Sequence, residues 1–180
     1  MPLFVYIAAK WLSYWSRKPP KYILWFVAGV MFVCNISLLG YLGLVHQRGT
    51  IDVIQTLSME DPKATRPMFL MPCHSTPLYS YLHSPMEIKF LTCEPDFTGK
   101  EQYLDEADVF FKNPEKWLIE NFNKYENITH IVMYDTLYPK VHKFLMTNHF
   151  KLNNSLFHTF HPEGRIGKYV HVYKHHNYNL

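Results

Sequence analysis

The sequence is poor in charge and in cysteine. Only 18% of its 180 residues are charged and three are cysteines, which excludes a disordered chain and a small disulfide-framework protein. No basic arm of the kind that binds nucleic acid occurs, and we expect no nucleic-acid partner. Acidic residues are missing from residues 1–45, whereas residues 46–180 contain all 15 of them. This asymmetry predicts two parts of the chain in two different solvents.

The motifs of several enzyme classes are missing as well. The chain has no P-loop, no dinucleotide fingerprint, no HExxH and no G-x-S-x-G nucleophile elbow. Cys73-His74, His83 and Cys93 lack the tight spacing of a zinc site such as C-x2-C, so we predict no metal and no cofactor. An adjacent His74-Ser75 pair does not by itself form a hydrolase triad.

Residues 23–45 form a run of 23 residues without charge, and this run predicts a transmembrane helix. At about 1.5 Å per residue it spans roughly 35 Å, enough for a hydrocarbon core of about 30 Å. Residues 1–22 predict a partial or interfacial hydrophobic helix followed by a basic loop around Arg17-Lys18. The positive-inside rule places that loop in the cytoplasm and residues 46–180 on the opposite, luminal side.

The luminal part reads as a linker and a small domain. Residues 46–66 are polar and indicate a helical turn or two and then a linker. Beyond them short apolar runs alternate with helical patterns, which favours an α/β domain over residues 67–180 with a mostly parallel sheet finished by an antiparallel hairpin. Strands are expected at 67–72, 88–93, 129–134, 156–160 and 169–173, and helices at 114–122 and 139–146.

Luminal placement predicts two modifications. Cys73 and Cys93 each end an expected strand, and parallel strands would bring these ends together in an oxidising compartment, so we expect a disulfide between them. The sequons that begin at Asn127 and Asn153 are candidate N-glycosylation sites. A third sequon, at Asn35, lies inside the expected membrane span and should be inaccessible.

The densest acidic cluster is Asp105, Glu106 and Asp108. Three carboxylates can assist glycosyl transfer or bind a cation through oxygen. Acidic residues that open a helix more commonly complement the helix dipole, and we favour this second interpretation.

Four stretches of the sequence resemble the carboxy-terminal part of mannosyltransferases in glycosyltransferase family 22. They are HQRGTIDV (46–53), MPCHSTPLYSYLH (71–83), FLTCEPDFTGKEQYLDEADVFFKNPEKWL (90–118) and HPEGRIGKYVHVYK (161–174). The resemblance implies an endoplasmic reticulum membrane enzyme with many transmembrane helices that acts in GPI-anchor biosynthesis. Such an α1,2-mannosyltransferase takes mannose from dolichyl-phosphate mannose on the luminal side and adds the third mannose to the GPI precursor.

The acidic motif that supplies the family's presumed catalytic base has no counterpart in this sequence. We therefore expect no catalytic residue in this chain, which would be a fragment, a short isoform or an incomplete gene model. Two functions stay open: the carboxy-terminal portion of a GPI mannosyltransferase, and a non-catalytic membrane-tethered module that binds glycolipid or a partner subunit. The sequence identifies no protein partner.

Aromatic residues make up 17% of the chain, and together with the missing base they suggest a luminal domain that caps a sugar site. Aromatic faces for sugar stacking would come from Tyr79, Tyr81 and Tyr103. Polar groups for sugar hydroxyls would come from His74, Asp96, Asp105 and Glu106.

Overall fold

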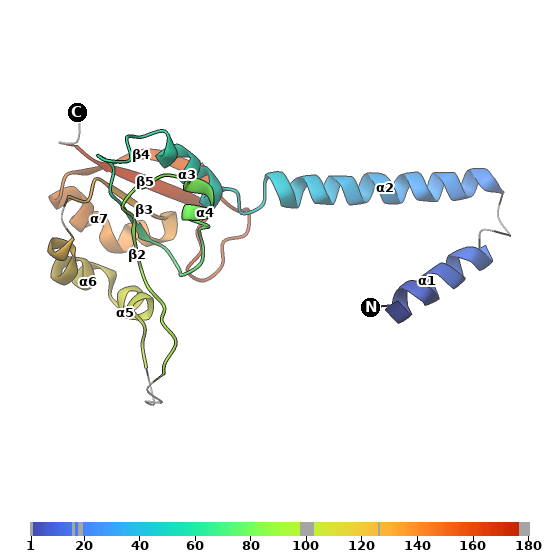
Figure 1. Cartoon of the computed structure of the whole chain (residues 1–180), viewed down its shortest axis with the longest axis horizontal. Helices are drawn as coiled ribbons and strands as arrows, with labels where there is room; N and C mark the ends of the chain where they lie inside the picture. The colour runs from blue at the N-terminus through green and yellow to red at the C-terminus, as the bar shows by residue number, and fades with distance from the viewer. Residues whose placement is uncertain (1, 16, 18–19, 98–102, 126, 177–180) are drawn as a thin grey trace. The chain divides into compact units, whose positions relative to one another are not determined.

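The computed structural model describes the chain except for residues 1, 16, 18–19, 98–102, 126 and 177–180 (Figure 1). The chain divides into two compact units, Met1–Leu44 and Val45–Leu180. The first unit contains α1 (Pro2–Trp15) and α2 (Lys21–Leu44). Part of the predicted basic loop, at residues 16, 18 and 19, lies outside the described residues.

Helix α2 is the part of the described chain that is long and apolar enough to cross a membrane. Its mean hydropathy reaches 2.2, and none of its residues is buried. A helix that is apolar on all sides and exposed on all sides suits a lipid environment rather than water. The helix corresponds to the transmembrane helix predicted at residues 23–45.

The second unit is built on a five-stranded sheet with the strand order β2-β1-β3-β5-β4. Its strands are β1 (Pro67–Leu70), β2 (Lys89–Phe90), β3 (His130–Tyr134), β4 (Phe150–Phe157) and β5 (Tyr169–His175). Strands β2, β1 and β3 are parallel, whereas β5 pairs antiparallel with both β3 and β4. The sheet is therefore mixed, with a parallel part and the antiparallel hairpin that was predicted at the end of the chain.

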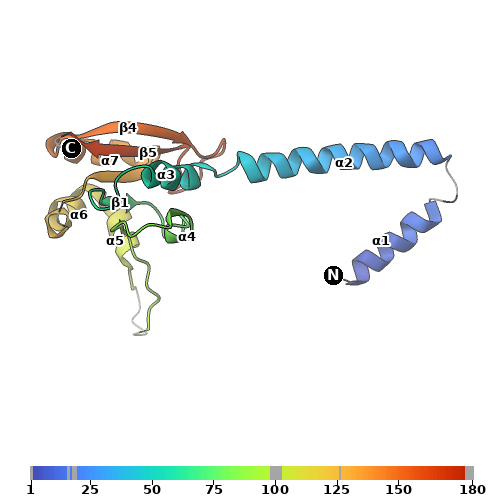
Figure 2. The same ribbon diagram turned by 45° about the horizontal axis from the view of Figure 1, so that its top comes forward.

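The physical reason is the hairpin of β4 and β5, which lie alongside each other (Figure 2). The predicted strand at 156–160 covers only the end of β4, which begins at Phe150. Residues 151–153 are exposed at the edge of the sheet, so they carry no alternating apolar pattern that a sequence search can detect. The hairpin was predicted, but the length of its first strand was not, for this reason.

Helices cover both faces of the sheet. Along β3, Ile131 and Met133 point to one face, and Val132 and Tyr134 to the other. The first face packs against α5 (Glu106–Lys112), α6 (Pro114–Asn121) and α7 (Tyr138–Thr147). The second packs against α3 (Gly49–Ser58) and α4 (Tyr79–Leu82). Short 3-10 turns lie at Phe122–Lys124 and Asp135–Leu137.

Helix α6 begins where the sequence predicts. The Asn113 side chain accepts a hydrogen bond from the amide of Lys116 at 3.2 Å, and Pro114 occupies the first helical turn. Asn at the N-cap satisfies a backbone donor that has no partner within the helix, while Pro has no amide hydrogen to leave unpaired. The local sequence thus fixes this boundary.

Helix α3 lies in the segment 46–66, where a helical turn or two and then a linker were predicted. Its Val53, Ile54 and Leu57 are buried against the sheet. These three side chains lie on one face of a helix, and burying each contributes about 1.5–3 kcal/mol. A polar average over the segment conceals this short apolar stripe.

The chain enters the second unit at the edge of the sheet where the parallel strands end, here called the carboxyl edge. Strand β4 is antiparallel to β5, and β5 is antiparallel to β3, so β4 ends at the same edge as β3. There the amide of Gln47 donates to the carbonyl oxygen of His158 at 2.8 Å. A Cβ on Gly49 would stand 2.8 Å from the carbonyl oxygen of Phe157.

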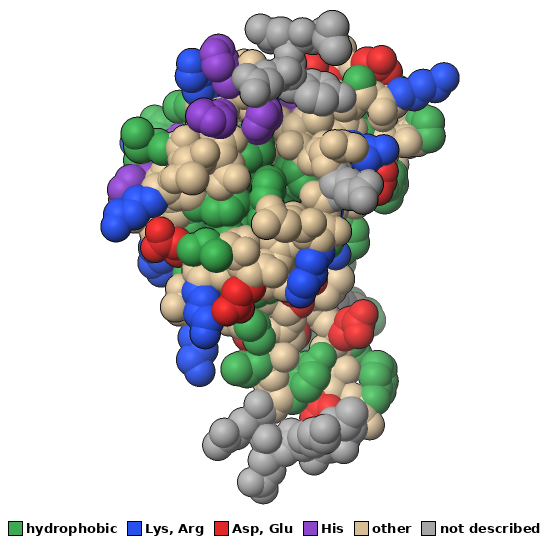
Figure 3. All heavy atoms as spheres, turned by 90° about the vertical axis from the view of Figure 1, so that its left-hand side faces the viewer, with side chains coloured by type: hydrophobic (Ala, Val, Ile, Leu, Met, Phe, Trp, Pro, Cys, Tyr) green, Lys and Arg blue, Asp and Glu red, His purple; other side chains and the backbone are tan. Residues whose placement is uncertain are grey.

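Histidine side chains gather on one part of the opposite, amino edge (Figure 3). His175 ends β5, and the amide of His176 donates to the carbonyl oxygen of His149 at 2.9 Å. The two edges therefore differ in chemical character.

Candidate functional site

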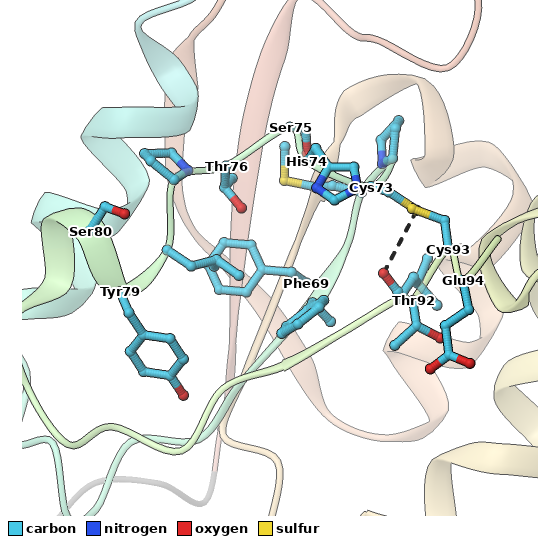
Figure 4. Close-up of a pocket in the computed structure, with 16 residues that line it drawn as sticks. Phe69, Cys73, His74, Ser75, Thr76, Tyr79, Ser80, Thr92, Cys93 and Glu94 are labelled. Atoms are coloured by element: carbon cyan, nitrogen blue, oxygen red, sulfur yellow. Dashed lines mark hydrogen bonds between the residues drawn. A yellow bond between two sulfur atoms is a disulfide. The ribbon is translucent and has the colours of Figure 1, made fainter.

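The candidate site is a pocket of about 510 Å³ at the carboxyl edge, beyond β1 and β2 (Figure 4). These strands are parallel neighbours, with Phe69 beside Phe90. The carboxyl ends of adjacent parallel strands are where α/β proteins most often bind ligands, because the loops that follow diverge there. The pocket is lined by residues 71–80 and 91–94 together with Phe69 and Phe90.

Aromatic rings form the apolar part of the pocket. Phe69 is buried in the core, whereas Phe90 is 43% exposed and Tyr79 is 51% exposed. The hydroxyl of Tyr79 donates to the carbonyl oxygen of Met86 at 3.1 Å. This bond holds the tyrosine at its outer end and leaves its ring face accessible for stacking.

Polar side chains line the rest of the pocket. They are His74, Ser75, Thr76, Ser80, Thr92 and Glu94. An accessible aromatic face beside several hydroxyl groups and one carboxylate matches the needs of a sugar, which presents apolar C–H faces and a ring of hydroxyl groups. The pocket contains no lysine or arginine.

The loop from residue 74 to residue 83 has a constrained backbone. His74, Leu78 and His83 have φ values of 59°, 35° and 49°. Positive φ values are unfavourable for bulky side chains and persist only where the surrounding structure enforces them. The fold therefore holds three residues of this loop in the left-handed region of backbone conformation.

Cys73 and Cys93 form a disulfide that joins the loops after β1 and β2 across the pocket wall. Their Cα atoms are 6.1 Å apart. The Asp105 carboxylate lies within 4.8 Å of both sulfur atoms. Oxidised sulfurs are not thiolates, so this trio is not a ligand set for zinc.

The structure brings two of the predicted sugar-contacting residues, His74 and Tyr79, into one pocket. Tyr81, Asp96 and Tyr103 are exposed and do not line it. Glycan attachment at the exposed residues Asn127 and Asn153 stays a prediction.

Asp105 and Glu106 have structural partners. Asp105 caps α5 by accepting a hydrogen bond from the amide of Asp108 at 2.6 Å. Glu106 accepts hydrogen bonds from the amide and the hydroxyl of Thr92 at 2.9 and 2.8 Å. The favoured interpretation of this acidic cluster, as the start of a helix, agrees with these contacts.

Sequence reasoning missed Phe90, Thr76, Ser80 and Glu94. The signal that could have found them was available, because they lie within or shortly after the apolar runs expected as strands at 67–72 and 88–93. The usable rule is that residues after adjacent parallel strands converge.

A second polar pair lies at the carboxyl end of β3. The hydroxyl of Tyr134 is 3.3 Å from Nε2 of His158. Burial raises the pKa of Tyr134 to about 12 and, with a smaller contribution from His46, lowers the pKa of His158. Near neutral pH the tyrosine is protonated and the imidazole neutral, so the pair acts as a hydrogen bond inside the fold.

Comparison with known proteins gives this geometry a context. Residues 1–83 match the model of the Alg9-like mannosyltransferase family. The chain is 45% identical to GPI alpha-1,2-mannosyltransferase 3 of Danio rerio over 152 residues, and 45% identical to the Homo sapiens protein of that name over 150 residues. It is 38% identical to GPI mannosyltransferase 3 of Drosophila melanogaster over 155 residues.

These alignments cover 81%, 80% and 81% of this chain, in that order, but only 28%, 27% and 28% of the relatives. The chain thus spans little more than a quarter of their length. No solved structure matches it. Residues 1–83 thus match the Alg9-like mannosyltransferase family, and the similarity to the GPI mannosyltransferases extends over about four-fifths of the chain.

Proposed function

We propose that this chain acts as the carboxy-terminal part of an α1,2-mannosyltransferase of GPI-anchor biosynthesis in the endoplasmic reticulum membrane. The observation that carries the proposal is the 45% identity to relatives named for this activity, over 81% and 80% of the chain. In this proposal α2 spans the membrane and the second unit lies in the lumen.

The proposed reaction transfers mannose from dolichyl-phosphate mannose to the GPI precursor. The 2-hydroxyl oxygen of the precursor's second mannose forms a bond to the anomeric carbon of the donor mannose. The bond between that carbon and the phosphate oxygen breaks, and dolichyl phosphate leaves. A base takes the proton of the hydroxyl group. We assign no residue of this chain as that base and propose no cofactor beyond the lipid donor.

The role proposed for the second unit is to hold the sugar part of the acceptor. The Tyr79 ring would stack on one sugar face, and His74, Thr76 and Glu94 would hydrogen-bond to hydroxyl groups. Holding the acceptor in one orientation lowers the barrier of a transfer reaction without any chemical step by the residues that hold it. The absence of an assigned base in this chain is compatible with that role.

The test uses cells that lack GPI α1,2-mannosyltransferase 3. They receive this chain alone, or the human relative with its corresponding segment replaced by this chain. Surface GPI-anchored protein is measured by flow cytometry, and the lipid-linked glycans are measured by mass spectrometry. We expect the chimera to restore the third mannose and the chain alone not to do so. A chimera that accumulates but leaves two-mannose precursors would overturn the proposal.

The pocket is tested in the same chimera with two matched tyrosine variants. Tyr79→Leu removes a ring that lines the pocket, whereas Tyr81→Leu removes an equally exposed ring of the same helix outside it. Loss of a stacking contact of about 1.4 kcal/mol corresponds to about tenfold in transfer rate. We expect that loss for Tyr79→Leu alone, at equal protein levels. Equal effects of the two variants would exclude sugar stacking at this pocket.

A further inference from the structure

We propose that a second pocket at the carboxyl edge binds a phosphate ester. This basic pocket has a volume of about 560 Å³ and lies beyond the end of β3. Its lining comes from α5, the turn Asp135–Leu137, α7 and the loop between β4 and β5. The lining residues that carry the argument are Asp108, Phe111, Lys112, Thr136, Lys140 and Arg165.

The charge of the basic pocket favours an anion. Among the described residues that line it, Lys112, Lys140 and Arg165 are cations and Asp108 is the one carboxylate, which leaves a net charge of +2 (three minus one). Across the described residues neither lysine has an ion pair. Two unpaired ammonium groups and a guanidinium that face one cavity attract a phosphate, which offers several strong acceptor oxygens.

Lys140 places a cation at the amino end of α7, opposite in sign to Asp135 of the preceding turn. It lies in the first turn of α7, a turn that contains no acidic residue. A cation there opposes the helix dipole, which favours negative charge at the amino end. An anion bound between Lys140 and the helix end would remove this conflict.

Arg165 is held in place before any ligand arrives. Its Nη2 atom lies 2.8 Å from Oδ1 of Asp108, and its guanidinium carbon lies 4.6 Å from the centre of the Phe111 ring. Both contacts fix a long side chain whose immobilisation would otherwise cost entropy on binding. The remaining N–H donors of the guanidinium are the groups that recognise phosphate oxygens.

A basic pocket at the amino edge provides the comparison. It is lined by Lys63, Arg66, His149 and His175, and the Arg66 guanidinium is already 3.3 Å from the Glu87 carboxylate. Only the pocket at the carboxyl edge shares an edge with the first pocket and with the point where the chain enters from α2. We take a membrane lipid as the source of the phosphate, because the donor in the proposed function is a lipid phosphate. The lipid source rests on the proposed function, whereas the phosphate site does not.

The experiment uses the full chain in phosphatidylcholine nanodiscs with its lysines ¹³C-methylated, so that each lysine gives its own NMR signal. The probes are inorganic phosphate, chloride at equal ionic strength, and nanodiscs that contain a polyprenyl phosphate. We expect phosphate to shift the Lys112 and Lys140 signals saturably and chloride not to do so. Lys140→Gln should weaken binding about tenfold, as the loss of one charged hydrogen bond predicts. Lys143→Gln, on the same helix outside the pocket, should leave it unchanged.

Asp108→Asn reverses the sign of the expected effect. Asn keeps an oxygen that can accept the Arg165 hydrogen bond but removes the negative charge, so phosphate binding should strengthen several-fold. Equal shifts by chloride, equal loss in Lys143→Gln, or weaker binding by Asp108→Asn would each overturn the site. Binding of inorganic phosphate without binding of polyprenyl phosphate would support the site and overturn the lipid source. If the chain binds polyprenyl phosphate but its chimera fails in cells, the lipid phosphate site is supported and the proposed function is overturned.

Discussion

The carboxylate of Glu106, in the first turn of α5, accepts two hydrogen bonds from Thr92. It accepts the amide of Thr92 at 2.9 Å and the hydroxyl at 2.8 Å, while the carbonyl oxygen of Thr92 accepts the amide of Ala107 at 3.1 Å. The loop after β2 is thereby attached to a helix that packs on the sheet. Glu106 thus positions Thr92, which lines the candidate pocket after β1 and β2, and does not itself line that pocket.

Replacement of Glu106 should therefore affect folding before it affects chemistry. Glu106→Ala leaves a partly buried amide and hydroxyl without their acceptor, which costs about 1–3 kcal/mol. Glu106→Gln keeps one carbonyl oxygen and should stay closer to the native protein. Pulse proteolysis of the full chain in detergent measures the free energy of unfolding. Glu163→Ala, at an exposed residue of the β4–β5 loop, is the control. Loss of mannose transfer in a Glu106→Gln chimera of native stability would instead assign Glu106 to the reaction.

The Cys73–Cys93 disulfide should stabilise the second unit. It closes a loop with a sequence separation of 20, and cross-linking a loop of that length restricts the unfolded chain by about 3 kcal/mol. We expect the double Cys→Ser variant to lose about that much stability, and Cys34→Ser to lose none. Iodoacetamide should label only Cys34 in the unreduced, denatured chain. Labelling of all three cysteines before reduction would contradict the disulfide.

Buried His130 should make the second unit sensitive to acid. Its side chain is 1% exposed, and burial lowers its pKa to about 4, with the Glu60 carboxylate acting in the opposite direction and Lys174 in the same direction. Because the folded pKa lies below that of the unfolded chain, this contribution to stability is complete above about pH 6.5. It is lost as the pH falls toward about 4, at a cost of about 2 kcal/mol by pH 5.

The measurement is the free energy of unfolding in detergent between pH 7 and pH 5. His130→Gln cannot gain a proton in this range and should show a pH dependence smaller by about 2 kcal/mol. His149→Gln, at an exposed histidine, should retain the slope of the native protein. An unchanged slope in His130→Gln would show that acid sensitivity arises elsewhere.

Elements of the fold that depend on local sequence were predicted, whereas those that depend on tertiary packing were predicted only in part. Helix α6 was predicted from Asn113 and Pro114, and strand β3 from an uninterrupted apolar run. Local chemistry determines both elements. The full length of α3 and the first half of β4 were not predicted, since their structure depends on tertiary packing against the rest of the unit. The candidate pocket after β1 and β2 was predicted only in part for the same reason. Its residues converge only when two parallel strands are placed side by side.

N-glycosylation provides a direct test of luminal placement. Asn127 has a φ of 59°, a conformation that Asn and Asp tolerate better than most residues, and Thr129 of its sequon is buried with its hydroxyl accepting the amide of Arg66 at 2.9 Å. Thr129 should therefore not be replaced, and Asn127→Asp is the appropriate variant. Asn153 lies exposed on edge strand β4, where Asn153→Gln is tolerable.

We expect treatment with peptide N-glycosidase to lower the apparent mass of the chain expressed in animal cells. The decrease on a gel should equal the mass of two glycans. On the same treatment Asn127→Asp and Asn153→Gln should each shift by one glycan, whereas Asn35→Gln, in α2, should shift by two, as the native chain does. Both sequons must face the lumen to be modified, because the oligosaccharyltransferase that attaches N-glycans acts only there. An unmodified chain in cells that modify a co-expressed luminal glycoprotein would contradict the orientation on which the proposed mannosyl transfer depends.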